Sequence, residues 1–366
     1  MFLPFIIIAI ATYFIWKISS PFDAAASYLT RNLSEGIKGP TVNAIASSLP
    51  ELLISFFFLF YIGDVQGFSA GFATIIGSSI FNIAMIPTIC FLVIYCKHGV
   101  SVFPTDKKII LQDGIFLILT EIVLLTALFF EGISVTLALG LIGLYLVYIF
   151  LIIYLRSKNN EPKVANAVLE VVSSKNTLRD KILHLDIIAL LFGKKPLTTF
   201  KAIIILLISV VIISISCKQL VNSSQHLSEV FNLNLFFVTF FIVAIVSSLP
   251  DTILSVKDAI NKKYKDSFSN AYASNIFDIC IGIGLPVLLY LIINGINEIS
   301  TDSSEIAAEF KDAKLNAIIL ISTVMLLLFT AVITLIYYIR DINLYRSILI
   351  ISLYFIFLGT IFYIAF

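Results

Sequence analysis

Charged residues are scarce in this chain. Asp, Glu, Lys and Arg make up 13% of its 366 residues, whereas soluble proteins usually contain about 25%. Apolar residues make up 59%, and the mean hydropathy is +1.04. This composition excludes a soluble globule and predicts an integral, multi-pass membrane protein in the lipid bilayer. The formal net charge of +1 gives no indication of a nucleic-acid partner.

Histidine and cysteine are also rare, with three and four residues. The cysteines lie in or at the ends of apolar runs without paired spacing, so they indicate neither a disulfide framework nor a zinc site. The Gly-x-Gly-Asp, Gly-x-Ser-Gly and His-Glu-x-x-His motifs of intramembrane proteases are missing. An intramembrane enzyme is therefore a poor alternative, and we expect no cofactor.

No basic residue precedes the first apolar run, because Lys17 follows the stretch from Met1 to Trp16. A cleavable signal has its basic region before the apolar one. We therefore expect a first transmembrane helix here.

Ten apolar runs are long enough to cross roughly 30 Å of hydrocarbon. They cover residues 1–18, 21–60, 68–96, 109–130, 133–155, 200–217, 221–260, 267–294, 315–339 and 345–366. The second and seventh runs are too long for simple spans, and they open with amphipathic portions at 22–38 and 221–232. Each also contains a proline, which removes a backbone donor, so we expect kinked or broken helices.

A sequence motif occurs once in each of these two long runs. Residues 44–56 and 244–256 share seven identities in thirteen positions, including the Ser-Ser-Leu-Pro segment. An acid follows each proline, Glu51 in the first copy and Asp251 in the second. A charge inside an apolar span costs roughly 2.5 to 3.5 kcal/mol, so these acids indicate an ion or proton site.

Basic residues collect in alternate loops between the runs. They are Lys97, Lys107 and Lys108; Arg156, Lys158, Lys163, Lys175, Arg179, Lys181, Lys194 and Lys195; Lys262, Lys263 and Lys265; and Arg340 and Arg346. The opposite loops carry Asp64, Glu131, Glu298, Asp302, Glu305 and Glu309. The positive-inside rule then places both termini outside and the 156–199 loop in the cytoplasm, and we expect the protein in a plasma or inner membrane.

Five runs precede that loop and five follow it, so the second half enters the membrane from the opposite side. The sequence predicts an all-α membrane protein with ten transmembrane helices in two inverted five-helix repeats, 1–155 and 200–366, with broken second and seventh helices. In such transporters the substrate lies near the midplane, where the repeats meet.

A second shared block follows each motif, at residues 77–83 and 273–279. Ser78 and Asn82 are four positions apart and share a helix face, as do Ser274 and Asp278. The pooled polar groups of both halves are Ser47, Ser48, Glu51, Ser78, Asn82, Ser247, Ser248, Asp251, Ser274 and Asp278, together with carbonyls freed at the prolines. All of these ligand atoms are oxygen, which suits hard cations such as calcium and sodium.

The two blocks resemble the α-1 and α-2 repeats, here 44–83 and 244–279, of the cation/calcium exchanger superfamily. In that family a G-(T/S)-S-x-P-(E/D) turn and a following G-S-N-x-x-(N/D) helix form one cation site. The resemblance implies central ligands at Glu51 and Asp251 and flanking ligands at Asn82 and Asp278. It also implies hydroxyl or carbonyl contributions from Ala44, Ser47, Ser48, Ser78, Ala244, Ser247, Ser248 and Ser274.

The implied activity is sodium/calcium exchange by alternating access, with calcium and sodium ions as the partners. The second repeat is similar to potassium-dependent sodium/calcium exchangers, in which the acid at the position of Asp278 is tied to potassium. A proton-coupled calcium antiporter remains the alternative. The chain departs from the family where its glycine is Ala46 or Val246, where Gly77 pairs with Ala273, and where Asn275 pairs with Ser79.

Glu121 lies in the middle of the fourth run, outside both repeats. Two interpretations stay open for it. It is either a proton-titrating or gating group, or a packed carboxyl that is protonated or bonded to a serine.

Overall fold

The computed structural model describes residues 2–31, 37–129, 132–157, 197–300 and 311–365. The long helices are α1 (Leu3–Leu29), α4 (Asp64–His98), α5 (Lys107–Phe129), α6 (Val135–Ser157), α9 (Thr199–Phe231), α15 (Lys311–Ile339) and α16 (Leu344–Ala365). Shorter helical segments are η1 (Gly39–Asn43), α2 (Ala44–Ser47), α3 (Leu49–Phe57), η2 (Phe58–Ile62), α10 (Leu235–Val238), η3 (Thr239–Val243), α11 (Ala244–Ser247), α12 (Leu249–Ile260), α13 (Tyr264–Phe277), η4 (Asp278–Ile283) and α14 (Gly284–Asn294), where η marks π-helical turns.

The part of the chain that the structure describes contains nine to ten of the ten predicted apolar spans. Nine helices are long and apolar enough to cross a membrane, and the number is ten if the bent pair Gly39–Ser47 and Leu49–Ile62 is counted as one span. The bend in that pair is 42°. The equivalent segment of the second half, Leu235–Ile260, counts as a single span.

Two predicted boundaries in the first half were wrong. The first span does not end at residue 18, because α1 continues through Pro21 to Leu29 and takes residues 22–29 of the amphipathic portion that we assigned to the second span. The segment after the proline contains three consecutive alanines, which favour helix. There Ala25 packs on Ala202 and Ile205 of α9, so tertiary contact supports the extension.

The same correction applies to the second half. Helix α9 runs to Phe231 and contains the portion 221–231 that we assigned to the seventh span. It ends where Asn232 adopts the left-handed conformation, with φ of 50°. The Asn234 side chain then accepts a hydrogen bond from Phe236 N–H and caps the next helix. The seventh span therefore begins at Leu235.

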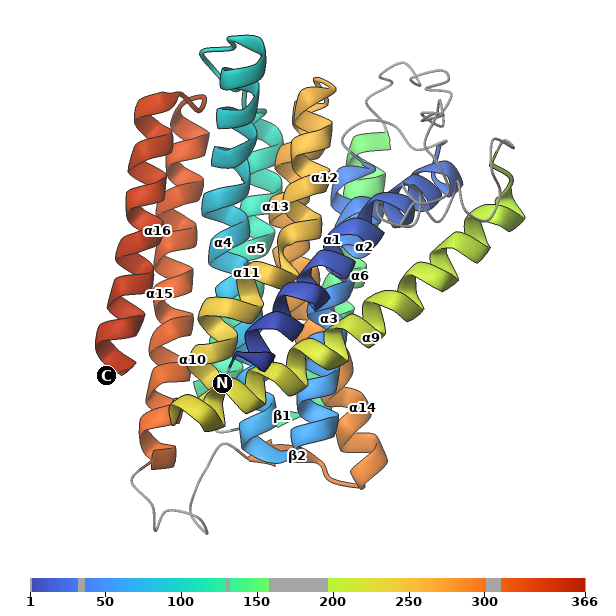
Figure 1. Ribbon diagram of the computed structural model, residues 1–366. Helices are drawn as coiled ribbons and strands as arrows, with labels where there is room; N and C mark the ends of the chain where they lie inside the picture. Colours follow the sequence, from blue (N-terminus) through green and yellow to red (C-terminus); the bar gives the residue numbers. More distant parts are fainter. Residues whose placement is uncertain (1, 32–36, 130–131, 158–196, 301–310, 366) are drawn as a thin grey trace.

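The helices form an inner and an outer group (Figure 1). In the apolar stretch of Gln66–His98, 67% of the residues are buried, and in those of Leu235–Ile260 and Tyr264–Asn294 the buried share is 61%. In the apolar stretches of α1, α6 and α16 only 28% of the residues are buried. Helices α1 and α9 lie side by side and cross the others obliquely. The inner group thus holds both motifs, and the outer helices carry apolar surface suited to lipid.

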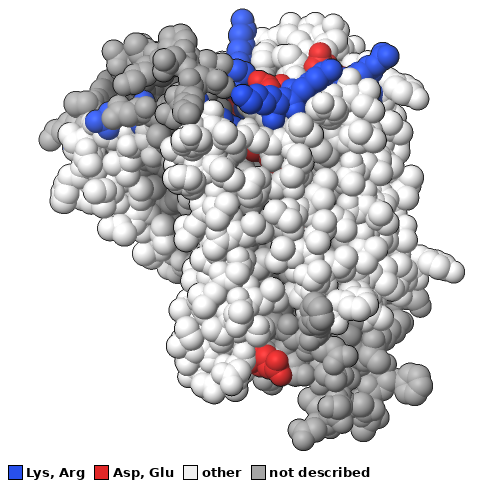
Figure 2. All heavy atoms as spheres, turned by 180° about the vertical axis from the view of Figure 1, so that it is seen from behind, with Lys and Arg blue, Asp and Glu red and all other residues white. Residues whose placement is uncertain are grey.

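Loops that the sequence assigned to one side of the membrane lie together in the structure. At one end Phe103 pairs with Ile342, and Lys265 lies 3.8 Å from Asp106. At the other end two short strands, β1 (Gly132–Ser134) and β2 (Glu298–Ser300), pair antiparallel. Figure 2 shows Lys and Arg gathered at the first of these ends.

Residues 158–196, which make up most of the 156–199 loop that we predicted to be cytoplasmic, lie outside the described residues. The acidic residues Glu131, Asp302, Glu305 and Glu309 also lie outside them.

Candidate functional site

Both motifs interrupt their helices at the second serine. Helix α2 ends at Ser47 and α3 begins at Leu49, and Ser48 between them has φ of −87° and ψ of 7°. The second motif breaks at Ser248, with φ of −78° and ψ of 0°. A proline follows in the first turn of each new helix, where its missing N–H costs nothing. The break therefore needs no glycine, and Ala46 and Val246 stay helical.

The acid after each proline lies in the first turn of its helix. Glu51 is in the first turn of α3 and Asp251 is in the first turn of α12. The partial positive charge of a helix N-terminus stabilises a carboxylate there. Both side chains are completely buried, so their carboxyl groups face the interior of the helix bundle.

Asp278 joins these two acids from η4. It is completely buried and interacts electrostatically with both Glu51 and Asp251. Ser78 Oγ donates to Asp278 Oδ2 at 3.5 Å, and Asn82 is buried on the same helix as Ser78. The structure thus places the three predicted acids within electrostatic reach of one another, and Asn82 lies one helical turn after Ser78.

Several hydrogen bonds at this site join one half of the chain to the other. Ser47 Oγ donates to Asp251 Oδ1, and Ser248 Oγ donates to Glu51 Oε1 at 3.4 Å. Asn275 Nδ2 donates to the Ser79 carbonyl at 2.8 Å. Within the second half, Ser274 Oγ also donates to Asp251 Oδ1. Each acid of one motif is therefore held by a hydroxyl of the other.

Several buried oxygen atoms of the site have no hydrogen-bond partner. The side-chain oxygen atoms without a partner here are Glu51 Oε2, Asn82 Oδ1, Asp251 Oδ2 and Asp278 Oδ1, and the amide nitrogen Asn82 Nδ2 also has none. Buried polar atoms are almost always bonded, because leaving one unpaired costs about 1–3 kcal/mol. Oxygen atoms that share one buried centre are suited to a hard cation.

The three acids do not suffice for a cation by themselves. Among the described residues, no three Asp, Glu, His or Cys side chains stand close enough to hold a metal ion. Calcium typically takes 6 to 8 oxygen ligands. A cation at this site must therefore also draw on hydroxyl, amide or carbonyl oxygens.

The alanine carbonyls that we predicted as ligands already accept backbone hydrogen bonds. The Ala44 carbonyl accepts from Ser48 N–H at 3.0 Å, and that of Ala244 accepts from Ser248 N–H at 3.2 Å. Ser247 Oγ also donates to the Ala244 carbonyl, at 3.1 Å. A carbonyl oxygen has two lone pairs, so one remains at Ala44 and none at Ala244.

Sequence reasoning missed two asparagines beside the site. Asn270 is buried next to Asp251, donates to Ser255 Oγ at 3.0 Å and leaves its Oδ1 unpaired. The Asn43 carbonyl oxygen lies 2.7 Å from Ser47 Oγ and competes with Asp251 for the single hydroxyl proton of Ser47. The signal for Asn270 was its position, because it precedes Ser274 by one helical turn and shares its face.

Glu121 lies apart from the three acids. Its Oε1 accepts from Thr330 on α15 at 2.8 Å, and its Oε2 is buried without a partner. Helix α15 carries none of the predicted ligands. Of the two interpretations, the geometry favours the packed carboxyl, and the residue bonded to it is a threonine where we expected a serine.

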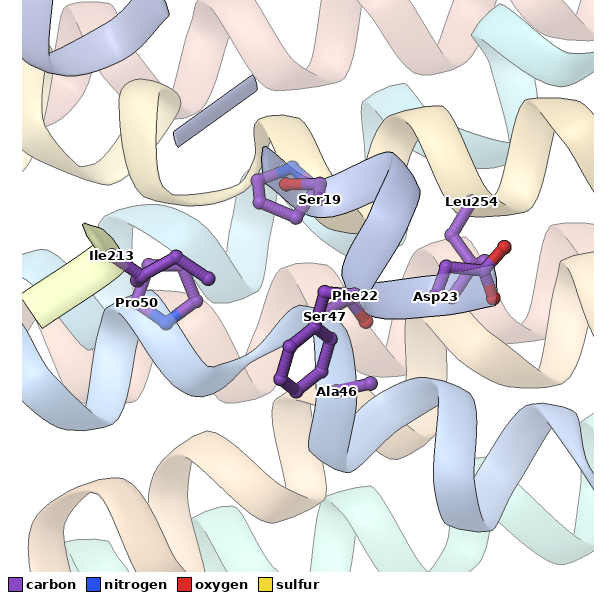
Figure 3. Close-up of a pocket in the computed structure, with 9 residues that line it drawn as sticks. Ser19, Phe22, Asp23, Ala46, Ser47, Pro50, Ile213 and Leu254 are labelled. Atoms are coloured by element: carbon purple, nitrogen blue, oxygen red, sulfur yellow. The ribbon is translucent and has the colours of Figure 1, made fainter. Parts of the chain in front are cut away.

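A small cavity lies against the first motif, between α1, α9 and the two prolines (Figure 3). Its volume of about 20 Å³ is enough for one water molecule. The residues that line it are Ser19, Phe22, Asp23, Ala46, Ser47, Pro50, Ile213, Pro250 and Leu254. Ser47 therefore touches both this cavity and the carboxylate of Asp251.

Comparison with known proteins identifies the family. The family model of the sodium/calcium exchanger protein matches residues 3–154 and 201–363. The sodium/potassium/calcium exchanger 3 of Rattus norvegicus is 34% identical over 124 residues, and that of Homo sapiens is 35% identical over the same length. These matches cover 34% of this chain and only 18% of either relative.

Solved exchanger structures have the same fold. The H+/Ca2+ exchanger CAX has a TM-score of 0.61 at 14% identity, and the alignment covers 98% of this chain and 85% of that one. The sodium-calcium exchanger NCX_Mj soaked with 10 mM Na+ has a TM-score of 0.53 at 21% identity, and the alignment covers 97% of both chains. At these identities the likeness shows the fold alone. With its apolar spans and its match to the family model over both halves, this chain is an integral, multi-pass membrane protein that belongs to the sodium/calcium exchanger protein family.

Proposed function

We propose that this protein is a secondary active antiporter that exchanges sodium for calcium across a membrane. The observation that carries the proposal is that Asp278 interacts electrostatically with both Glu51 and Asp251, although all three acids are completely buried and lie on different helical segments. Family membership supports cation/calcium antiport rather than catalysis, and the proposal requires no cofactor.

The ligands of the transported ions are the buried oxygen groups of the two motifs. Glu51 and Asp251 are the central ligands, and Asn82 and Asp278 flank them. Further oxygens come from the serines and alanines of both repeats, Ala44, Ser47, Ser48, Ser78, Ala244, Ser247, Ser248 and Ser274. The unpaired oxygen atoms at this site support the assignment, because a bound cation would complete their coordination.

Potassium is a further candidate ion. Two curated relatives are sodium/potassium/calcium exchangers, and Asp278 has an oxygen atom without a partner. We propose that Asp278 binds potassium when potassium takes part in the exchange.

We also propose that the two halves are inverted repeats, with broken helices at Ser48 and Ser248. The matching order of elements in the two halves and the hydrogen bonds that cross between the motifs support this arrangement. The basic end of Figure 2 then faces the cytoplasm, and the termini lie outside. The 156–199 loop is cytoplasmic in this orientation.

Alternating access follows from the charges. Three buried acids without a cation repel one another and have lost the hydration of their carboxylates. The empty carrier therefore crosses poorly, whereas the loaded carrier changes between its inward-open and outward-open forms. This difference enforces exchange over leak, and a sodium gradient drives calcium transport.

The test uses purified protein in liposomes loaded with sodium and diluted into sodium-free buffer. We expect uptake of radioactive calcium that depends on internal sodium and is lost in Asp251→Asn. Asp251→Asn keeps the size of the side chain, and its thermal unfolding in detergent serves as the folding control. A folded variant that transports as well as wild type would overturn the assignment.

A proton-coupled antiporter is the second candidate, because CAX, an H+/Ca2+ exchanger, has the same fold. The same liposomes distinguish the two candidates when a pH gradient replaces the sodium gradient. Calcium uptake that responds to the pH gradient and ignores sodium would replace sodium coupling with proton coupling.

A further inference from the structure

The cavity beside the first motif has an acid at its wall. Asp23 lies on α1, two residues after Pro21, and is 8% exposed. Figure 3 shows it in the same cavity as Ser47 and Ala46 of the first motif. A cation in this cavity would therefore lie between the carboxylate of Asp23 and a hydroxyl that already contacts Asp251.

The carboxylate of Asp23 forms an ion pair with a lysine side chain. Lys257 Nζ bonds to Asp23 Oδ2, and Ser27 Oγ donates to Asp23 Oδ1 at 3.0 Å. The Lys257 side chain is 49% exposed, whereas that of Asp23 is 12% exposed. The acid is thus held inside, and its positive partner reaches in from the surface on a flexible stem.

Lys257 belongs to the same helix as the central acid. It follows Asp251 by six positions in α12, a rise of about 9 Å along the axis. Helix α12 ends at Ile260 and leads into the basic turn with Lys262 and Lys263. Asp23 and Lys257 therefore lie between the buried acids and the basic end of the molecule.

Other charged groups surround the pair without replacing Lys257. Asp258 on α12 interacts electrostatically with Asp23, Lys38 and Lys263. Lys38 Nζ donates to Ser27 Oγ at 2.6 Å, and Ser27 is the second partner of Asp23. These groups give the region both signs of charge, but the direct bond to Asp23 comes from Lys257.

We propose that Asp23 is an access site for the transported cation on the path between the basic end and the central acids, and that Lys257 is a tethered cation that competes for it. The inference rests on the proposed exchange function and adds a site outside both motifs. An arriving calcium or sodium ion displaces the ammonium group of Lys257, takes the carboxylate of Asp23 and moves through the cavity toward Ser47.

This arrangement predicts opposite effects for the two partners of one ion pair. Asp23→Asn removes the ligand, so the KM for calcium at the basic face should rise about fivefold. Lys257→Gln removes the competitor, so that KM should fall by a similar factor. In the double variant the carboxylate is gone and the competitor no longer matters, so the KM should match that of Asp23→Asn.

The measurement needs transport from one known face at a time. Cys96 near the end of α4 is exposed, and the other three cysteines are buried. A maleimide that does not cross membranes therefore labels the liposomes in which the basic end faces out. Calcium transport at this face is then compared with transport at the opposite face, where neither variant should change the KM.

Lys262→Gln is the matched control, since it removes an exposed positive charge at the same end without touching Asp23. We expect it to leave the KM unchanged. If the ion pair only fastens α1 to α12, both single variants will change the KM in the same direction or at both faces, and the access site is refuted. Wild-type protein that transports no calcium would instead refute the proposed function, and this inference with it.

Discussion

Ser47 of the first motif donates a hydrogen bond to the carboxylate of Asp251 in the second motif, 204 positions later in the chain. Ser274 donates to the same carboxylate oxygen. The other oxygen of Asp251, Oδ2, is buried without a partner. Two hydroxyl groups from different helices thus hold one oxygen of the acid and leave the second oxygen for a ligand.

Replacement of Ser47 by alanine should weaken calcium binding about tenfold. A hydrogen bond to a charged group contributes about 1.5–3 kcal/mol, and 1.4 kcal/mol corresponds to a factor of ten. Ser47→Thr keeps the hydroxyl group and should bind like wild type. Ser352→Ala, on the exposed face of α16, is the control. Equal defects in the alanine and threonine variants would mean that side-chain size, and not the hydrogen bond, matters at this position.

Asp278→Asn should remove any stimulation of transport by potassium while the protein still exchanges sodium for calcium at a reduced rate. The amide keeps the size of the side chain and can still accept from Ser78, but it loses the charge that potassium would neutralise. Calcium uptake with and without potassium measures the effect. Potassium stimulation that survives the substitution would contradict the assignment of Asp278.

Gly77→Ala should lower the stability of the folded protein. A Cβ at this position would lie 2.6 Å from the Phe240 carbonyl oxygen and 2.7 Å from Ala244 Cβ. Such overpacking costs about 1–3 kcal/mol. Gly140→Ala is the matched control, because a Cβ there meets nothing within 4 Å. Thermal unfolding in detergent should show a lower Tm only for Gly77→Ala, and equal Tm values would mean that the helices can separate at this crossing.

Asp113→Ala should destabilise the protein by about 3–5 kcal/mol, the usual cost of leaving a buried charge without its partner. Asp113 on α5 pairs with Arg156 of α6 at 2.7 Å, and it also accepts from Ser269 of α13. Lys265→Ala breaks the more exposed pair with Asp106 and should cost less than about 1 kcal/mol. Unfolding of both variants under the same conditions provides the comparison, and similar losses would show that the buried pair is solvated.

Much of the site could be predicted from residue type and spacing. Glu51 and Asp251 were found because each acid follows a proline inside an apolar run, and the motif occurs twice. Asp278 was found from the second shared block. In each case the cost of a charge in hydrocarbon made the position informative. The Asp23–Lys257 pair was not found, because no repeated pattern marks either residue and their partnership depends on how α1 crosses α12.

Composition and the spacing of apolar runs were enough to predict a membrane protein with many apolar spans, of which the described residues contain nine to ten, because apolar length and the thickness of the bilayer are linked physically. They did not establish where the first and sixth helices end. Helix α1 passes Pro21 and packs on α9, and a cap at Asn232 ends α9. Only the tertiary structure decided that Ser47 donates its hydrogen bond to Asp251 and not to the acid of its own motif. That pairing results from the packing of helices that are far apart in the chain.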